Sequence, residues 1–288
     1  MALAIGAAMN LHRISVCAVF CFTFACSDGV GSVCSDPCGT QDAGVDALTP
    51  DGSSTPDANA DAPPPPSTPQ GLSNLGLWLE ASQGVGKFDA AHVAQWQDQS
   101  GHGNHVQQGT LTAMPLFVPS AVHGRPGLSF DLATLSTPSA TQGFSMAADF
   151  LVMLVVRSDL ADGISGDLFT ATGAASNTKL QLRISPPKLT ALALVNGSGT
   201  YVDAAKAVFS DKAAHVVGMR RQGGTVDLYV DGSKASVAVQ TADLGSKLTL
   251  GGGGFKGVIT ELAIGEGTID DTTVASLGTY FKTKYATP

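Results

Sequence analysis

The chain has 288 residues, of which 14% are charged and 34 are glycine, a length that suits one large domain or two small ones. Its formal net charge of −8 is unevenly distributed: residues 1–70 hold seven aspartates and one base, Arg13, whereas residues 71–288 hold 17 acidic and 15 basic residues. A nearly neutral region without basic clusters is poorly suited to binding phosphates. Nucleic acid is therefore not expected as a partner.

Residues 1–25 are predicted to be a signal peptide. An apolar run of 12 residues, 14–25, follows His12 and Arg13 and is too short to cross a bilayer comfortably as a helix. The run ends at Ala25-Cys26 and turns polar, which resembles the processing site of bacterial lipoproteins, where the Cys after a small residue is lipidated. We therefore predict that Cys26 carries lipid and that the chain is exported and held at a bacterial membrane or cell surface by this anchor alone. The alternative is simple secretion, with Cys26 as an ordinary thiol.

All five cysteines lie within residues 17–38, so the rest of the chain has no disulfide, no thiolate nucleophile and no cysteine-based zinc site. Cys34 and Cys38 lie in the segment Cys-Ser-Asp-Pro-Cys. In an oxidising compartment they could close a small disulfide loop; a weak metal pair and two unpaired linker thiols are the alternatives.

Residues 26–70 are predicted to be a disordered linker. From about residue 40 the composition is Asp, Ala, Pro, Ser, Thr and Gly, with four consecutive prolines at 63–66. Such a segment cannot bury enough apolar surface to offset its ordering entropy, and its like charges and polyproline tract keep it extended. It would act as a spacer between the membrane and residues 71–288.

Residues 71–288 contain several runs with the period-two alternation of half-buried strands, as at 179–184 and 225–230. Residues 150–156 are apolar throughout, which is typical of a central strand covered on both faces. We expect about eleven strands, near residues 75–79, 127–130, 150–156, 168–171, 180–184, 189–195, 215–220, 226–230, 235–239, 248–250 and 258–264.

Turn and helix signals complete the prediction of the fold. Asp231-Gly232 lies between two alternating runs and predicts a type I′ hairpin, which needs positive φ at both positions. Only the end is helical in pattern: Asp270 or Asp271 can cap a helix at 272–285, where apolar residues recur at helical spacing. These elements predict an all-β domain, a two-sheet antiparallel jelly-roll sandwich with a short C-terminal helix.

Three groups of segments carry a family resemblance. They are LWLEAS at 77–82 with VAQWQDQSGHGN at 93–104, GRPGLSFD at 124–131, and VDLYVDG at 226–232 with LTLGG at 248–252 and FKGVITEL at 255–262. Together they resemble the concanavalin-A-like, laminin-G-like jelly-roll domains of exported bacterial proteins, over about residues 73–286. The resemblance implies this fold, which hosts lectins, adhesion modules, glycanases and spacers, and it does not choose among them.

The densest polar loop runs from Trp96 to Asn104. Asp98 and Asn104 carry oxygen atoms of the kind that calcium prefers; the alternative is that both bond backbone amides while Gly101 and Gly103 adopt positive φ. Trp96 could stack on a sugar or pack in the core. No cofactor is required by any motif, and calcium is the one candidate.

No catalytic residues are predicted. Glycanases of this fold use closely spaced carboxylates on one strand. Residues 71–288 contain three glutamates, Glu80, Glu261 and Glu266, and the last two are five apart, which places them on opposite faces of a strand. We therefore expect a surface-tethered, non-catalytic binding module for glycan or another extracellular polymer. The alternatives are a structural or protein-interaction (adhesion) domain and, less favoured, a glycan hydrolase.

Overall fold

The computed structural model describes residues 68–288, apart from 139–145, 147, 174–177, 196–197 and 240–246. Contacts divide the chain into two compact units, Met1–Ala58 and Asn59–Pro288, and all described residues belong to the second. The predicted signal peptide, Cys26, Cys34, Cys38 and the linker up to residue 67 lie outside the described residues.

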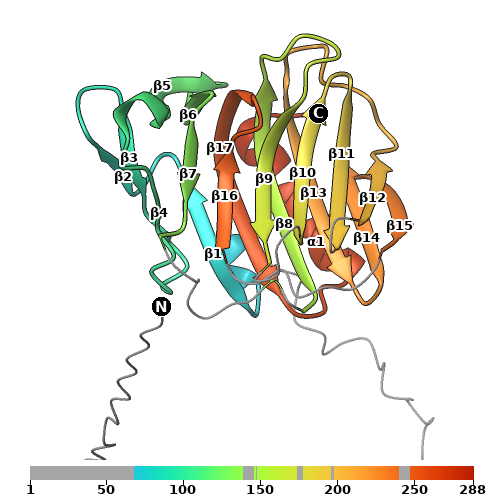
Figure 1. Cartoon of the computed structure of the whole chain (residues 1–288). Coiled ribbons are helices and arrows are strands. Elements are labelled where there is room, and N and C mark those ends of the chain that lie inside the picture. The colour runs from blue at the N-terminus through green and yellow to red at the C-terminus, as the bar shows by residue number, and fades with distance from the viewer. Residues whose placement is uncertain (1–67, 139–145, 147, 174–177, 196–197, 240–246) are drawn as a thin grey trace, which may run out of the picture. The chain divides into compact units, whose positions relative to one another are not determined.

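The described residues form two antiparallel sheets, as predicted (Figure 1). In the eight-stranded sheet, sheet A, the strands run β15-β14-β13-β8-β17-β6-β5, and β1 also pairs with β17. Its strands are β1 (Leu75–Glu80), β5 (Leu116–Val122), β6 (Arg125–Asp131), β8 (Phe150–Ser158), β13 (Ala214–Gln222), β14 (Thr225–Val230), β15 (Ser233–Ala238) and β17 (Lys256–Glu266).

The nine-stranded sheet, sheet B, has the order β12-β11-β10-β9-β16-β7-β4-β3-β2. Its strands are β2 (Val85–Lys87), β3 (Val93–Trp96), β4 (Val106–Gln107), β7 (Thr134–Ser136), β9 (Gly166–Thr172), β10 (Lys179–Ser185), β11 (Lys188–Val195), β12 (Ser198–Asp203) and β16 (Lys247–Gly251). The helices of the described residues are two short 3₁₀ helices, η1 (Pro69–Gly71) and η2 (Leu111–Ala113), and one α-helix, α1 (Asp271–Tyr285).

The main core lies between the two sheets. Alternating apolar residues of both sheets fill it, among them Phe169 of β9, Leu250 of β16 and Leu154 of β8, all without exposed surface. This arrangement follows from the period-two pattern, because every second side chain of a half-buried strand points to the same face.

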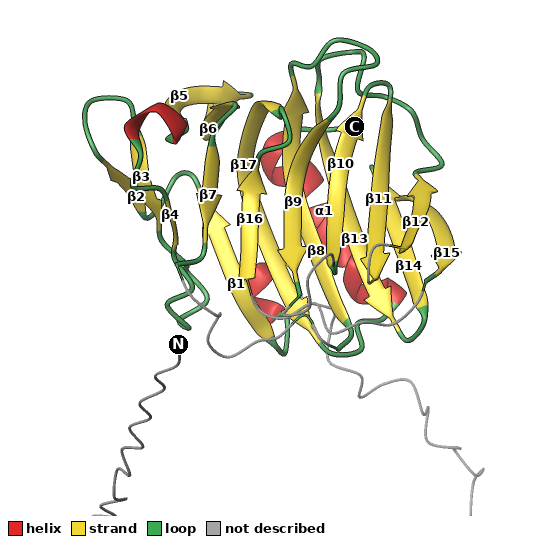
Figure 2. Cartoon of the chain, viewed as in Figure 1, coloured by secondary structure: helices red, strands yellow, loops and turns green. Residues whose placement is uncertain are grey.

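A second, smaller core lies on the outer face of sheet A, where α1 packs (Figures 1 and 2). The helix buries Val274, Leu277, Phe281 and Tyr285, as their spacing predicted, and the carboxylate of Asp270 caps it by accepting the Thr273 N–H at 2.7 Å. The helix explains why β8 is apolar on both sides. Leu151, Met153 and Val155 face the helix, whereas Phe150, Val152, Leu154 and Val156 face sheet B.

The predicted hairpin at Asp231-Gly232 is confirmed. Both residues have positive φ, 48° and 83°, and they join β14 to β15 as the type I′ turn requires. All eleven expected strands are present. The structure adds six that were not expected: β2, β3, β4, β5, β7 and β12.

Candidate functional site

The loop after β3 is held by one carboxylate. Asp98 is buried, and its Oδ1 accepts the backbone N–H groups of Trp78 (3.0 Å) and Ser100 (2.8 Å). Its Oδ2 accepts the N–H of Asn104 (2.9 Å) and the Ser100 hydroxyl (2.8 Å). The Asn104 amide in turn donates to the Gly76 carbonyl at 2.8 Å. Four protein donors therefore occupy the carboxylate, and the loop is tied to β1.

This geometry is the backbone-bonding alternative for the loop, and Gly101 and Gly103 have the positive φ values it needs, 94° and 74°. The Asp98 oxygens are not left free for a cation, so these residues do not fit a calcium site in this arrangement. Within the described residues, no group of three or more His, Cys, Asp or Glu side chains is arranged to hold a metal ion. Calcium binding at Asp98 and Asn104 stays an untested prediction.

Both tryptophans are buried. Trp96, considered for ligand stacking, has no exposed surface and lies in the core between the sheets. Stacking needs an accessible ring face, so the structure assigns Trp96 to packing. Trp78 lies on the opposite side of sheet A, under α1, where its indole N–H donates to Glu261 at 2.7 Å.

Two of the three glutamates meet on sheet A. Glu80 of β1 and Glu261 of β17 are directly opposite in the antiparallel register, and both accept the Lys284 ammonium of α1, at 2.9 and 2.7 Å. Glu261 has no exposed surface and Glu80 has 6%. Burial alone would raise the pKa of Glu80, but hydrogen bonds from Ser82 and Lys284, together with the Lys284 charge, hold it below its usual value.

Aromatic hydroxyls complete this cluster. Tyr280 donates to Glu261 Oε1 at 3.1 Å and Tyr285 to Oε2 at 2.8 Å. Burial, followed by the Glu261 charge, raises the pKa of Tyr285, and burial raises that of Tyr280 to about 12. The two carboxylates are thus ion-paired beneath a helix rather than open to a cleft, which leaves neither free to act as acid or nucleophile. We call Glu80, Glu261, Tyr280, Lys284 and Tyr285 the helix anchor.

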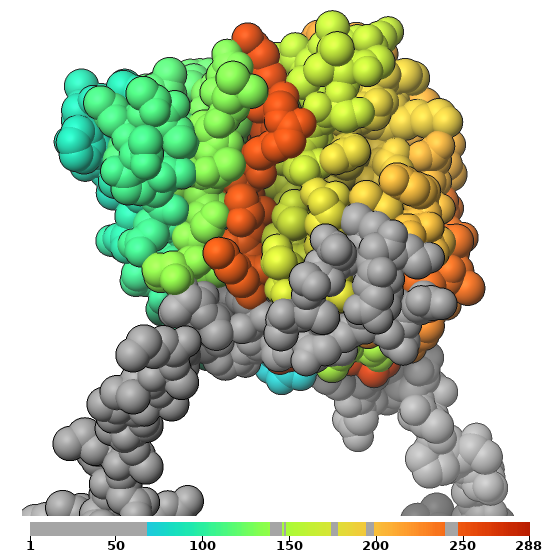
Figure 3. Space-filling model, viewed as in Figure 1, coloured from blue at the N-terminus to red at the C-terminus, as the bar shows by residue number. Residues whose placement is uncertain are grey.

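The outer face of sheet B is different in chemistry. Across its neighbouring strands β9, β16, β7, β4 and β3, the paired residues form one straight row, Thr170, Thr249, Ser136, Gln107 and Gln95. Each is at least partly exposed, and the residues on either side of Thr249, Leu248 and Leu250, belong to the inner core. We call these five residues the polar row. Figure 3 views this side of the molecule, where the surfaces of β7, β16 and β9 adjoin.

The polar row carries hydroxyl and amide groups and no charge. The hydroxyls of Ser136 and Thr249 share a hydrogen bond of 2.9 Å, and Gln181 of β10 donates to the Thr170 hydroxyl at 3.3 Å. Further along the face, the register continues through the buried residues Gln181 and Leu192 to Tyr201 of β12, which is 63% exposed.

A glycine loop closes the end of this face. Asp167 of β9 accepts Arg183 at 2.7 Å and Gln181 at 2.8 Å, and the loop Gly251–Gly254 folds over it. All four glycines have positive φ, and a Cβ on Gly253 would lie 2.5 Å from the Asp167 carboxylate. Only glycine allows this approach. The Arg183 charge compensates Asp167, so the face stays electrically neutral there.

A buried histidine, His215, lies near the start of β13 in sheet A. His215 is 1% exposed, and its ring nitrogens contact Asp231 at 2.8 Å and Asp211 at 3.0 Å. Burial alone would lower the pKa of His215, but the hydrogen bonds and charges of the two aspartates raise it above its usual value. Asp231 also pairs with Lys206 at 2.9 Å. The cluster holds the segment around Lys206 to the β14–β15 turn.

The sequence alone did not predict the helix anchor or most of the polar row. The helix anchor joins residues nearly 200 positions apart, and no local pattern pairs Glu80 with Glu261. The outward residues of β10 and β16 could be read from the alternation, but their neighbours on β4 and β7 could not, because those strands are two and three residues long. Among the described residues, no helix has the length and apolar character needed to span a bilayer.

The fold defines the protein as a two-sheet antiparallel β-sandwich with a helix on the outer face of one sheet. No family model and no curated protein matches the chain. Among solved structures, the binding domain of botulinum neurotoxin serotype D is similar, with a TM-score of 0.49, 13% identity, and coverage of 72% of this chain and 51% of that one.

Two further structures give comparable values. The binding domain of botulinum neurotoxin DC in complex with SialylT has a TM-score of 0.47 at 13% identity. A structure of botulinum neurotoxin type C, a toxin whose cell entry depends on interaction with two ganglioside molecules, has a TM-score of 0.48 at 12% identity. Each covers 72% of this chain and 51% of the other. The chain thus spans about half the length of these structures, and a similarity at this level carries no information on its ligand.

Proposed function

We propose that this chain is an exported, lipid-tethered and non-catalytic binding module, which holds a glycan or another neutral extracellular polymer on the outer face of sheet B. The polar row is the observation that carries the proposal. Its five side chains offer hydrogen-bond donors and acceptors on adjacent strands, and hydroxyl-rich polymers present the complementary groups.

The dimensions and charge of the polar row favour a polymer over a small molecule. Adjacent strands lie about 4.8 Å apart, so five strands span roughly 19 Å, more than a small ligand needs. The row has no carboxylate and no ammonium, and the Asp167–Arg183 pair beside it is internally compensated at 2.7 Å. Lys179 and Lys247, which both pair with Thr172, lie beyond the row, and the row itself offers only hydroxyls and amides. The hydroxyls of a neutral polymer can exchange their bonds to water for hydrogen bonds to these groups.

A polysaccharide panel tests the proposal directly. The full chain, carrying Cys26→Ser so that it is soluble, is applied to immobilised glycans with calcium and with a chelator. The double variant Gln95→Ala/Gln107→Ala removes two amides from the polar row and should weaken binding about fivefold or more, because each neutral hydrogen bond contributes on the order of 1 kcal/mol.

The matched control is Gln70→Ala, which removes an exposed amide from η1, next to β1 of sheet A. It should leave binding unchanged. Absence of binding to every glycan of a broad panel would end the proposal, and so would an equal loss of binding in the control and the double variant.

A second function, protein interaction, is favoured by an exposed apolar corner. Phe88 is 63% exposed and Leu116 41%, and they lie on neighbouring segments, since the Phe88 N–H donates to the His92 carbonyl and His92 bridges to Leu116. Leu111, which is 42% exposed, lies five residues before Leu116 in the chain. Clustered apolar side chains at a surface are typical of interfaces. If the glycan panel is silent while Phe88→Ser abolishes binding to immobilised extracellular proteins, this second function replaces the first.

The tether has its own test. Lipidation of Cys26 predicts that labelled fatty acid is incorporated into the chain and that the chain partitions into detergent. Cys26→Ser should abolish both. A Cys26→Ser chain that still fractionates with membranes would remove lipidation from the proposal without touching the binding face.

A further inference from the structure

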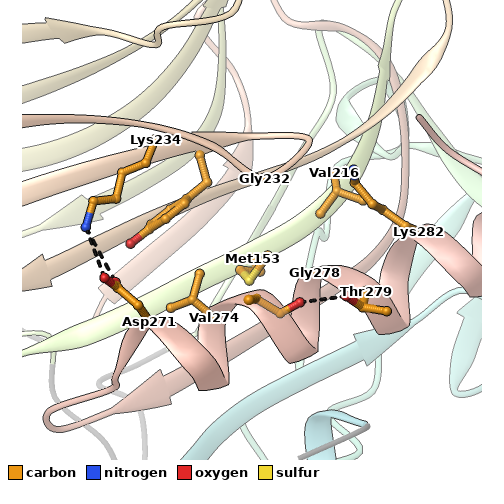
Figure 4. A pocket seen from close by; sticks show the side chains of 11 residues that line it. Met153, Val216, Gly232, Lys234, Asp271, Val274, Gly278, Thr279 and Lys282 are labelled. Carbon is orange, nitrogen blue, oxygen red and sulfur yellow. Dashed lines mark hydrogen bonds and ion pairs between the residues drawn. The ribbon is translucent and has the colours of Figure 1, made fainter.

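A pocket of about 380 Å³ lies between α1 and the outer face of sheet A (Figure 4). This face is the opposite side of sheet A from sheet B and its polar row. The volume falls at the lower end of the range of small-molecule sites, about 300–1,000 Å³. Its walls come from both elements and are mainly apolar: Met153, Val216 and Tyr229 of the sheet, and Val274, Ala275 and Gly278 of the helix.

Small helix residues leave this space open. Where α1 lines the pocket it presents Val274, Ala275 and Gly278, and the larger buried residues of its stripe, Leu277, Phe281 and Tyr285, are not part of the lining. Outside its own helix backbone and chain neighbours, a Cβ on Gly278 would meet Met153 Cε as its nearest atom, at 3.6 Å. Glycine inside a helix costs about 1 kcal/mol relative to alanine, so the space is retained despite a local penalty.

The rim of the pocket carries an excess of positive charge. Figure 4 shows Lys234 and Lys282 at opposite ends of the opening. Lys282 donates to the Asp231 carbonyl at 3.0 Å, and no carboxylate of the described residues forms an ion pair with it. The contact of Lys234 with Asp271 is long, 3.4 Å, and Asp271 is already bound more closely by Arg220, at 2.6 Å.

Asp227 does not change this balance. It lies 3.6 Å from Lys234 and is itself bound by Arg220 at 2.6 Å. The charged side chains that line the pocket are therefore two cations, Lys234 and Lys282, and one carboxylate, Asp271, while Arg220 pairs with Asp227 beside them. The lining thus holds one more cation than carboxylates, beside an apolar interior.

We propose that this pocket, which we name the helix pocket, binds a small amphipathic organic anion. The apolar body lies against Met153 and Gly278, and a carboxylate is held by the lysines at the rim. A short aliphatic carboxylate fits both features, because its chain meets apolar walls and its head meets the excess cation. A neutral or cationic head would leave the rim charge uncompensated.

Methionine methyl NMR provides the test, since Met153 lines the helix pocket. The full chain carrying Cys26→Ser is labelled with ¹³C-methyl methionine, and the Met153 signal is identified by its loss in Met153→Leu. Sodium octanoate should shift this signal saturably, whereas octylammonium, with the same tail and the opposite head, should bind at least fivefold more weakly. An unresponsive Met153 signal, or equal affinity for the two amphiphiles, would overturn the proposal.

Three variants locate the ligand. Gly278→Leu fills the helix pocket, because helical side chains lean towards the N-terminus and so towards Val274, and octanoate affinity should fall at least tenfold. Gly278→Ala is the control and should retain affinity within about threefold. Lys234→Gln should weaken octanoate about two- to fivefold and leave octylammonium unaffected or tighter.

Thermal unfolding of each variant checks that it is folded. If Gly278→Leu does not fold, the Lys234→Gln comparison decides, because removing an exposed charge leaves the packing intact. Octanoate affinity that is identical in wild type and Lys234→Gln would contradict the role of the rim.

Discussion

The helix anchor yields the sharpest prediction on stability. Replacing Glu261 with glutamine keeps the shape of the side chain and removes its charge. In the wild type, four donors converge on this fully buried carboxylate: the Trp78 indole at 2.7 Å, Lys284 at 2.7 Å, Tyr285 at 2.8 Å and Tyr280 at 3.1 Å. The amide oxygen of glutamine can accept about two of them, and its NH₂ group then faces the rest.

The expected loss follows from this geometry. Removing one partner of a buried ion pair costs about 3–5 kcal/mol. Lys284 retains Glu80 as a second partner at 2.9 Å, which places Glu261→Gln near the lower end, about 3 kcal/mol. For a domain of this size, 1 kcal/mol corresponds to a Tm change of about 2–4 °C, so the Tm should fall by about 6–12 °C.

Urea unfolding and calorimetry measure this loss, and hydrogen exchange of the Trp78 indole reports whether the helix loosens first. The matched control is Glu266→Gln, on the same strand but partly exposed, which should cost less than about 1 kcal/mol. If Glu261→Gln unfolds no more easily than Glu266→Gln, the buried charge is not what holds α1 to sheet A.

Three further predictions concern single positions. Because the pKa of His215 is raised in the folded state, its contribution to the stability of the fold is complete below its unfolded pKa, about 6.5, and is lost as pH rises through the folded value. The Tm difference between wild type and His215→Gln should therefore shrink at alkaline pH. A difference that grows there would contradict the pairing with Asp231. Gly278→Ala should stabilise the protein by about 1 kcal/mol in urea unfolding, because its Cβ meets only Met153 at an ordinary contact distance, and a loss of stability would show that the helix is closer to the sheet than described. Because Asp98 is occupied by backbone amides, chelation should leave the Tm unchanged while Asp98→Ala lowers it; a Tm raised by calcium would restore the metal alternative.

The overall fold was largely predictable because its longest strands repeat with period two. The alternation at 180–184 and 226–230 marks β10 and β14, and the uninterrupted apolar run at 150–156 marks a strand covered on both faces. The covering element was also visible in advance as the helical stripe ending at Tyr285. That stripe predicts a helix packed on the sandwich, but not that β8 is one of the strands beneath it.

The unexpected strands have physical reasons for being missed. β2, β3, β4 and β7 contain two to four residues, too few for any alternation to show. β5 is interrupted by Pro119, which cannot donate to a ladder, and its register shifts between Val118 and Val122 at the edge of sheet A. β12 begins Ser-Gly and reads as a loop. Because the short strands β3, β4 and β7 carry three of the five residues of the polar row, the candidate site could not be assembled from the sequence.

The two faces of the sandwich differ in the kind of ligand that they can hold, and ionic strength separates them. Sheet A carries the charged groups of the helix anchor and of the pocket rim, where an anion is held by Lys234, which is 39% exposed. Exposed charge pairs are screened by salt, with a Debye length of about 10 Å at 0.1 M and 3 Å at 1 M. Octanoate affinity should therefore fall as salt increases.

Hydrogen bonds from the polar row to a neutral polymer have no such dependence, so glycan binding should remain constant over the same salt range. A glycan interaction that weakens in parallel with octanoate would mean that charge holds the polymer, either on the helix side or at Lys179 and Lys247 beside the polar row, and the assignment of a neutral polymer to the polar row would fail.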